Sequence, residues 1–270
     1  MGPGGGCHPP VVDEPLRYLV RPELRDPTLV LAFEGWNDAG EAATSAVRYV
    51  VDALGAAPLA EIDPEPFFDF TVRRPRVEIA DDGVRRIAWP VTELRYGSAD
   101  PERDLVLGLA IEPHFRWRLY ADRILELARE LRVRRVVLLG AYLADVLYSR
   151  PVGVSGFATP PDLLDPLGVT PSAYEGPTGI VGVLAERFAR EKLPMISLWA
   201  ALPHYISAQP NPRGALALMQ VLGRVLDLKL DTKPLEELAA EFEERIAALV
   251  ASDPDLSEYV KQLKRREFAQ

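Results

Sequence analysis

Acidic, amide and histidine side chains stand just after four apolar segments of this chain. They are Glu34, Asn37, Asp38, Glu112, Asp145 and His204. If the apolar segments are parallel strands, these side chains meet at the carboxyl edge of one sheet, where open α/β sheets form their ligand crevices. Carboxylates and a histidine at such an edge could bind a small ligand, hold a metal ion or carry out acid/base catalysis. Their spacing matches no metal motif and no complete catalytic set, so we predict ligand contacts and assign no catalytic or metal-ligating residue.

Several of these side chains also have a structural interpretation. Asp38 precedes an alanine-rich segment and Glu41 follows three residues later, which is the arrangement of a helix-capping box. Glu112 could cap the helix after it, and Asp145 could pair with Arg150. For each of these residues, the structural interpretation and the ligand-binding interpretation both stay open at the level of sequence.

The loop from 34 to 40 is the most informative segment of the chain. An apolar run ends there, Gly35 turns the chain and an alanine-rich segment begins, which predicts a strand-to-helix junction. Trp36 in this loop could form a stacking wall for a ligand, pack on its own core or lie in an interface.

A second candidate site stands at Glu175 and the turn that follows it. In Gly176-Pro177-Thr178-Gly179, Thr178 lies near the start of a predicted helix, where free backbone amides favour a phosphate or carboxylate. The Walker pattern and an adjacent lysine are both missing, so a tight turn capped by Thr178 is the alternative interpretation.

The elements that would position these residues alternate along the chain. Segments that are apolar on consecutive positions must be buried on both faces, as in a central parallel sheet. We therefore predict central strands at 29–33, 105–111, 136–139 and 195–199. Apolar residues at helical spacing predict helices over 42–54 and 117–131 that pack on this sheet.

Other segments differ in pattern. Asp82-Gly83 favours a tight turn, so 76–90 is predicted to form a β-hairpin on the edge of the sheet. The segment 142–179 is rich in proline and glycine and predicts an extended loop with at most one short helix, near 162–167. After 231, two helical stripes separated at Asp253-Pro254-Asp255 predict a helical hairpin, which could pack on its own core, cover a neighbouring subunit or dock another protein.

Composition narrows the classes of function. The chain has 270 residues, 48% of them hydrophobic, and a net charge of -9. With no block of basic residues we expect no nucleic-acid partner, and with no apolar run of about 20 residues we expect no membrane span. The single cysteine, Cys7, lies in a Gly/Pro-rich segment, which favours a reducing compartment such as the cytoplasm. We predict a disordered tail over 1–15, an α/β core domain over 16–230 and the helical hairpin over 231–270.

Several stretches together resemble one protein family. They are Glu34-Gly35-Trp36-Asn37-Asp38-Ala39-Gly40, Glu175-Gly176-Pro177-Thr178-Gly179-Ile180 and Ser197-Leu198-Trp199-Ala200, with shorter matches such as Phe67-Phe68-Asp69-Phe70 and Pro203-His204-Tyr205. In this order they resemble the proteasome assembly chaperone two family, in its bacterial, actinobacterial form. The resemblance covers nearly all of 16–263.

The resemblance implies a three-layer α/β core of the phosphorylase/hydrolase type, with a mostly parallel or mixed sheet. It also implies a homo-oligomer, with a trimer favoured, and neither a cofactor nor an established reaction. Relatives in eukaryotes and archaea help to assemble or bind the proteasome, some through a C-terminal tail with a penultimate tyrosine. This chain ends Phe268-Ala269-Gln270, so docking by that route is not expected.

Two functions follow as hypotheses. The first is a non-enzymatic, protein-binding scaffold that resembles an assembly chaperone and contacts proteasome subunits. The alternative is a small-molecule-binding protein or hydrolase-like enzyme, whose polar pocket would join the 34–38 loop to Glu175, Thr178 and His204. A purely structural ring subunit would instead show a large apolar contact between chains.

Overall fold

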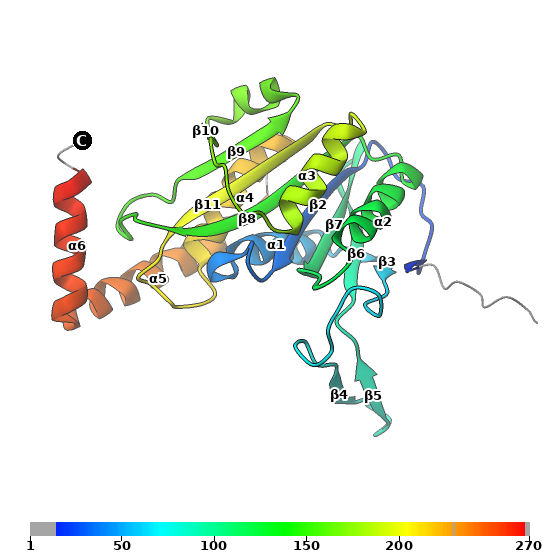
Figure 1. Ribbon diagram of the computed structural model, residues 1–270, viewed down its shortest axis with the longest axis horizontal. Helices are drawn as coiled ribbons and strands as arrows, with labels where there is room; N and C mark the ends of the chain where they lie inside the picture. Colours follow the sequence, from blue (N-terminus) through cyan, green and yellow to red (C-terminus); the bar gives the residue numbers. More distant parts are fainter. Residues whose placement is uncertain (1–14, 229, 268–270) are drawn as a thin grey trace, which may run out of the picture.

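The computed structural model describes residues 15–228 and 230–267. The predicted N-terminal tail, apart from its last residue, and the tripeptide Phe268-Ala269-Gln270 lie outside the described residues. Figure 1 shows a central twisted sheet with helices on both faces, a hairpin that projects from the body and two helices at the C-terminal end.

The described part of the chain forms a nine-stranded mixed sheet in the order β1-β3-β6-β7-β2-β8-β11-β9-β10. The strands are β1 (Leu16–Tyr18), β2 (Thr28–Glu34), β3 (Ala57–Ile62), β6 (Thr92–Asp100), β7 (Arg103–Ile111), β8 (Arg135–Ala144), β9 (Val154–Thr159), β10 (Thr170–Pro171) and β11 (Met195–Pro203). The four predicted central strands are confirmed as β2, β7, β8 and β11, and they are adjacent and parallel. Their carboxyl ends therefore share one edge.

Helices cover both faces, so the predicted three-layer core is confirmed. On one face lie α1 (Ala42–Leu54) and α4 (Pro212–Leu226), and on the other lie α2 (Trp117–Glu130) and α3 (Ile180–Arg190). Alternate residues of β2 enter the two cores: Val30 packs in the α1/α4 core and Leu31 in the α2/α3 core. This double burial explains why the central strands are apolar on consecutive positions.

The predicted hairpin forms, but its predicted place is wrong. β4 (Arg76–Ile79) and β5 (Arg85–Ala88) pair only with each other, in a separate two-stranded sheet that extends away from the body. Gly83 at its tip has a φ of 75°, the positive value that the predicted turn requires. We call this hairpin the projecting ribbon.

The prediction of an extended loop over 142–179 is also wrong. β8 continues to Ala144, β9 adds an antiparallel strand beside β11, and the short strand β10 pairs with β9. The short helix predicted near 162–167 is confirmed as the 3-10 helix Pro161–Leu167. A second 3-10 turn, Ala39–Glu41, leads from β2 into α1.

The C-terminal segment forms the predicted pair of helices, α5 (Lys233–Ser252) and α6 (Pro254–Glu267). Their buried side chains, Phe242, Ile246, Val250, Val260 and Leu263, form a third apolar cluster with Leu147 and Ile206 from the core. The helices therefore pack on their own chain, as one of the three interpretations predicted. The predicted domain division at residue 230 stays a prediction.

Candidate functional site

The 34–38 loop and the start of α3 meet at the carboxyl edge of the sheet. Asn37 Nδ2 donates a hydrogen bond to Glu112 Oε1 over 2.8 Å, and the backbone N–H of Ile180 donates to the same oxygen over 2.8 Å. The backbone carbonyl of Asn37 accepts from the N–H of Ala141 over 2.8 Å. Four segments far apart in sequence are thereby joined at this edge.

Glu112 occupies the place that sequence suggested for a bound anion. Its carboxylate lies at the N-terminus of α3, where free amides and the helix dipole favour negative charge. The structure therefore corrects two expectations. Thr178 does not cap α3: the N-cap position is Gly179, and the Thr178 hydroxyl donates to the Gly179 carbonyl. Glu112 caps α3 rather than α2.

Close packing around this carboxylate leaves little room for a ligand. Asn37 is fully buried, and a β-carbon at position 179 would overlap both its side chain and that of Glu112. Asn37 Oδ1 has no hydrogen-bond partner among the described residues. Glu34 contributes only its backbone to the cluster: its carbonyl accepts from the N–H of Glu112 over 2.9 Å, whereas its carboxylate pairs with Arg73 over 2.9 Å.

Asp38 is buried and caps α1. Its Oδ1 accepts hydrogen bonds from the N–H of Ala43 over 2.7 Å and of Thr44 over 3.3 Å, and the Thr44 hydroxyl donates to Oδ2. The predicted capping role of Asp38 is confirmed. The predicted return bond from the Glu41 side chain to Asp38 is not found among the described residues. Instead, the backbone N–H of Glu41 donates to the backbone carbonyl of Asp38.

We expect the stability of the protein to decrease between pH 4 and pH 7 because of Asp38. Burial raises the pKa of this carboxyl from 3.8 to about 6, although the bonds from Thr44 and Ala43 act in the opposite direction. An acid whose pKa is higher in the folded state stabilises the fold below its unfolded pKa, and that contribution is lost as the pH rises through the folded pKa. The loss amounts to about 3 kcal/mol.

Asp38→Asn is the variant that isolates this effect, because Asn keeps the acceptor for Ala43 without a titrating group. The measurement is urea unfolding of both proteins at pH 4, 5, 6 and 7. The free energy of unfolding of the wild type should fall relative to that of the variant as the pH rises. Parallel pH profiles would contradict the prediction.

Asp145 and His204 form a separate cluster with α6. His204 Nε2 lies 3.0 Å from Asp145 Oδ1 and 2.8 Å from the Tyr259 hydroxyl, which in turn donates to Asp145 Oδ1 over 3.2 Å. Desolvation and the neighbouring carboxylate raise the pKa of Tyr259. Asp145 therefore pairs with His204 rather than with Arg150, whose guanidinium lies 3.5 Å from Glu267.

Among the described residues, no serine, threonine or cysteine lies in hydrogen-bond reach of the His204 imidazole. A histidine held by a carboxylate is part of a Ser-His-Asp arrangement, but within 15–228 and 230–267 the partners of His204 are the Asp145 and Tyr259 side chains. Nor do the described residues contain a group of three His, Cys, Asp or Glu side chains that could hold a metal ion. No helix in the described ranges is long and apolar enough to cross a membrane.

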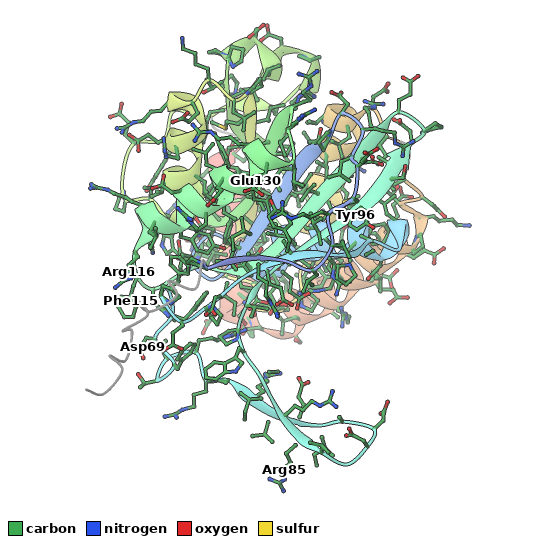
Figure 2. The ribbon with its side chains drawn as sticks, turned by 90° about the vertical axis from the view of Figure 1, so that its right-hand side faces the viewer. Asp69, Arg85, Tyr96, Phe115, Arg116 and Glu130 are labelled. Carbon is green, nitrogen blue, oxygen red and sulfur yellow. The ribbon has the colours of Figure 1, made fainter. Side chains whose placement is uncertain are left out.

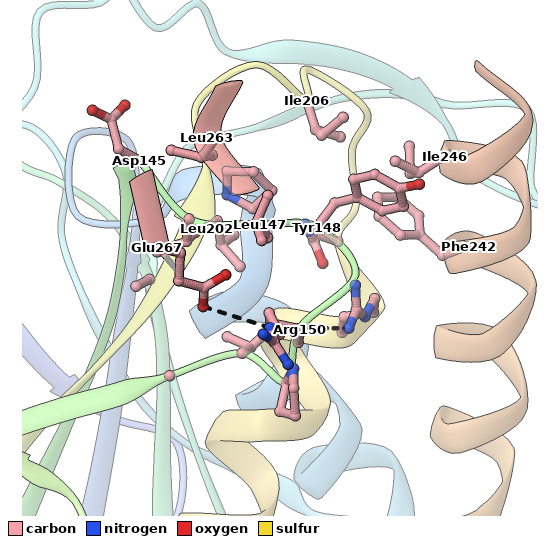
Figure 3. A pocket seen from close by; sticks show the side chains of 18 of the residues that line it. Asp145, Leu147, Tyr148, Arg150, Leu202, Ile206, Phe242, Ile246, Leu263 and Glu267 are labelled. Atoms are coloured by element: carbon pink, nitrogen blue, oxygen red, sulfur yellow. Dashed lines mark hydrogen bonds and ion pairs between the residues drawn. The ribbon is translucent and has the colours of Figure 1, made fainter. Parts of the chain in front are cut away.

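A cavity of about 500 Å³ lies between the core and the C-terminal helices (Figure 3). Its walls combine apolar side chains such as Phe242 and Leu147 with the charged pair Arg150 and Glu267. Of the nine residues predicted to bind a ligand, only Asp145 lines it. The cavity thus does not join the 34–38 loop to Glu175, Thr178 and His204.

Exposed apolar side chains lie in the loop after β2, at the end of β8 and in the loop before α3. We call Trp36, Tyr142, Leu143 and Tyr174 the apolar rim; Trp36 is 59% exposed and Leu143 57%. The hydrogen bond between Asn37 and Ala141 brings Trp36 and Tyr142 to the same edge, each one residue away from that bond. Glu175, next to Tyr174, is exposed on the same loop.

The structure thus divides the predicted site into two groups. Asn37, Asp38 and Glu112 join the 34–38 loop to α1 and α3, whereas Asp145 and His204 join the ends of β8 and β11 to α6. Ligand binding by the nine predicted residues stays a prediction. The sequence analysis does not single out Tyr259, because its position in the second helical stripe after 231 is typical of a packing residue and only its hydroxyl group suggests a polar role.

Comparisons with known proteins agree with this architecture. The sequence model of the PAC2 family matches residues 32–250. A crystal structure of a PAC2 family protein from Streptomyces avermitilis is similar at 42% identity and a TM-score of 0.80, covering 87% of this chain and 100% of that one. No curated protein sequence matches the chain.

Two further solved structures are similar. A Mycobacterium tuberculosis proteasome-assembly chaperone homologue is 40% identical with a TM-score of 0.78, covering 86% of this chain and 99% of that one. An archaeal proteasome activator from Pyrococcus furiosus is 21% identical with a TM-score of 0.67, covering 87% and 97% of the two chains, and at this identity it shows the fold alone.

Proposed function

The chain belongs to the PAC2 family, and from this premise we propose that it is a protein-binding assembly scaffold that contacts proteasome subunits. It acts by binding alone, as a homo-oligomer, with a trimer favoured, in the cytoplasm. The supporting relative is the proteasome-assembly chaperone homologue of Mycobacterium tuberculosis, which matches along almost its whole length.

The observation that carries this proposal is the contrast between polar and apolar groups at the carboxyl edge. Asn37, Asp38 and Glu112 direct their hydrogen bonds to their own chain. The side chains left exposed beside them are those of the apolar rim, including Trp36 and Leu143. Exposed aromatic and aliphatic groups of this kind are typical of protein contacts, where Trp and Tyr contribute much of the binding free energy.

The alternative, a small-molecule or hydrolase-like function at the same edge, has less support. It requires an open polar pocket there, whereas Asn37 and Glu112 are packed against Gly179 and the cavity lies beside α5 and α6.

A double substitution in the apolar rim, Trp36→Ala with Leu143→Ala, is expected to weaken binding to proteasome subunits at least about tenfold. Both side chains are more than half exposed, so their removal leaves the core intact. The measurement is the dissociation constant for unassembled α-type and β-type subunits of the host proteasome, by biolayer interferometry.

The matched control for this variant is Leu19→Ala, which removes an exposed leucine directly after β1, an outermost strand of the sheet. It should bind as the wild type does. If the wild type binds neither kind of subunit, the proposed function is wrong; if the rim variant binds as tightly as the wild type, the rim is not the contact.

A further inference from the structure

The projecting ribbon has one apolar face that stays exposed among the described residues of its own chain. Val77 stands opposite Ile87 and Ile79 opposite Arg85, and strand alternation places these four side chains on the same face. Val77, Ile79 and Ile87 are all at least half exposed. Figure 2 shows the ribbon extending from the body, with Arg85 far from Phe115 and Asp69.

The base of the ribbon is held in place, so its direction is defined. Phe70 and Trp89 pack edge to face with ring centroids 4.9 Å apart. Arg73 pairs with Glu34 at the end of β2. A two-stranded ribbon is at best marginally stable by itself in water, and an exposed apolar face of this kind is stabilised when another surface covers it.

The strand residues on the apolar face of the ribbon carry a positive charge, although the chain as a whole is acidic. The ribbon, 76–88, contains three arginines and three acidic residues in a chain of net charge -9, but Arg85 is the charged residue of the two strands that shares a face with Val77, Ile79 and Ile87. Arg86 pairs with Asp82. For Arg74, Arg76 and Arg85, no ion pair occurs within the described parts of the chain. A surface that covers the ribbon should therefore combine apolar groups with negative charge.

α5 presents a surface of this composition. The helix contains five glutamates against one lysine and one arginine. Leu238 is 53% exposed, and Glu237, Glu241 and Glu244 are exposed near it on successive turns. Glu243, by contrast, already pairs with Arg213.

We propose that the apolar, basic face of the projecting ribbon packs against the exposed acidic face of α5 in a second copy of this chain. Figure 1 shows the ribbon and α5 leaving the body at different places, so the contact falls between copies. The two surfaces differ, so the interface is head-to-tail and generates a closed ring when the rotation between copies closes. The inference rests on the self-association included in the proposed function.

Charge reversal tests this contact. Arg85→Glu and Glu241→Arg each place like charges across the interface, and each should raise the dissociation constant of self-association at least about tenfold. The double variant exchanges the charges and should restore self-association to near the wild-type value. Sedimentation velocity over a range of protein concentrations gives these constants.

Arg118→Glu is the matched control for Arg85→Glu, because it makes the same change in net charge at an exposed position of α2. It should leave self-association unchanged. The inference is overturned if the wild type is a monomer at every concentration, if both single variants associate as the wild type does, or if the double variant fails to recover.

These outcomes are distinguishable from failure of the wider proposal, since binding to proteasome subunits is measured separately on the same proteins. A wild type that binds subunits but stays monomeric would retain the scaffold function and refute the ribbon contact. If Arg85→Glu weakens only subunit binding, the ribbon docks on the subunit and not on a second copy.

Discussion

Replacing Glu112 by alanine is expected to lower the free energy of unfolding by about 2–4 kcal/mol. The substitution removes the one carboxylate oxygen that accepts from both Asn37 Nδ2 and the Ile180 N–H. Asn37 is fully buried, so its unpaired amide would carry the desolvation penalty without compensation. Chemical unfolding at pH 7 measures the change.

Glu112→Gln is the control that separates hydrogen bonding from charge. Its Oε1 can accept both bonds, so it should retain most of the stability and lose only the favourable interaction with the α3 N-terminus, about 0.3–1 kcal/mol. If the alanine and glutamine variants lose equal stability, charge matters here and the shared hydrogen bonds do not. If neither loses any, Glu112 does not hold the edge together.

Phe242→Ala is expected to cost about 3–5 kcal/mol and to release the C-terminal helices from the core. Phe242 is 4% exposed and lies in the cluster that joins α5 to Leu147 and Ile206. It also forms part of the cavity wall in Figure 3, so removing its ring enlarges a space that is already about 500 Å³. Side chains beside an existing cavity cannot readily close over the gap.

Hydrogen exchange followed by mass spectrometry checks this second prediction. Amides of α5 and α6 should lose protection in the variant, whereas those of β2 and β8 should keep it. Leu249→Ala, on the exposed side of the same helix, should leave protection unchanged. Equal protection of α5 in Phe242→Ala and the wild type would show that the helices are held by other contacts.

The central architecture was predictable because the four inner strands are buried on both faces. That burial requires consecutive apolar residues, which a single sequence displays directly. β9 was not predictable in the same way: it lies near the edge of the sheet, has only six residues and includes Gly156 in a segment rich in proline and glycine. Its place depends on pairing with β11, which is a tertiary contact.

The candidate site was predictable only in part. Asp38 could be assigned as a cap because its partners are five and six residues away. Glu112, in contrast, caps a helix that begins 68 residues later, and nothing local marks that partner. The pairing of Asp145 with His204 and Tyr259 likewise joins residues distant in sequence. Topology predicted the common edge but not which side chains would meet on it.

The strand order has a consequence for biosynthesis. β2 is made early, yet its partners in the sheet are β7 and β8, and Thr28 pairs with Arg135 about 100 residues downstream. At translation rates of about 5–20 residues per second, the ribosome needs roughly 5–20 s to supply that second neighbour. During this interval the apolar nascent strand has an unpaired edge that can associate with other chains. We therefore expect the emerging polypeptide to require a chaperone bound near the ribosomal exit tunnel.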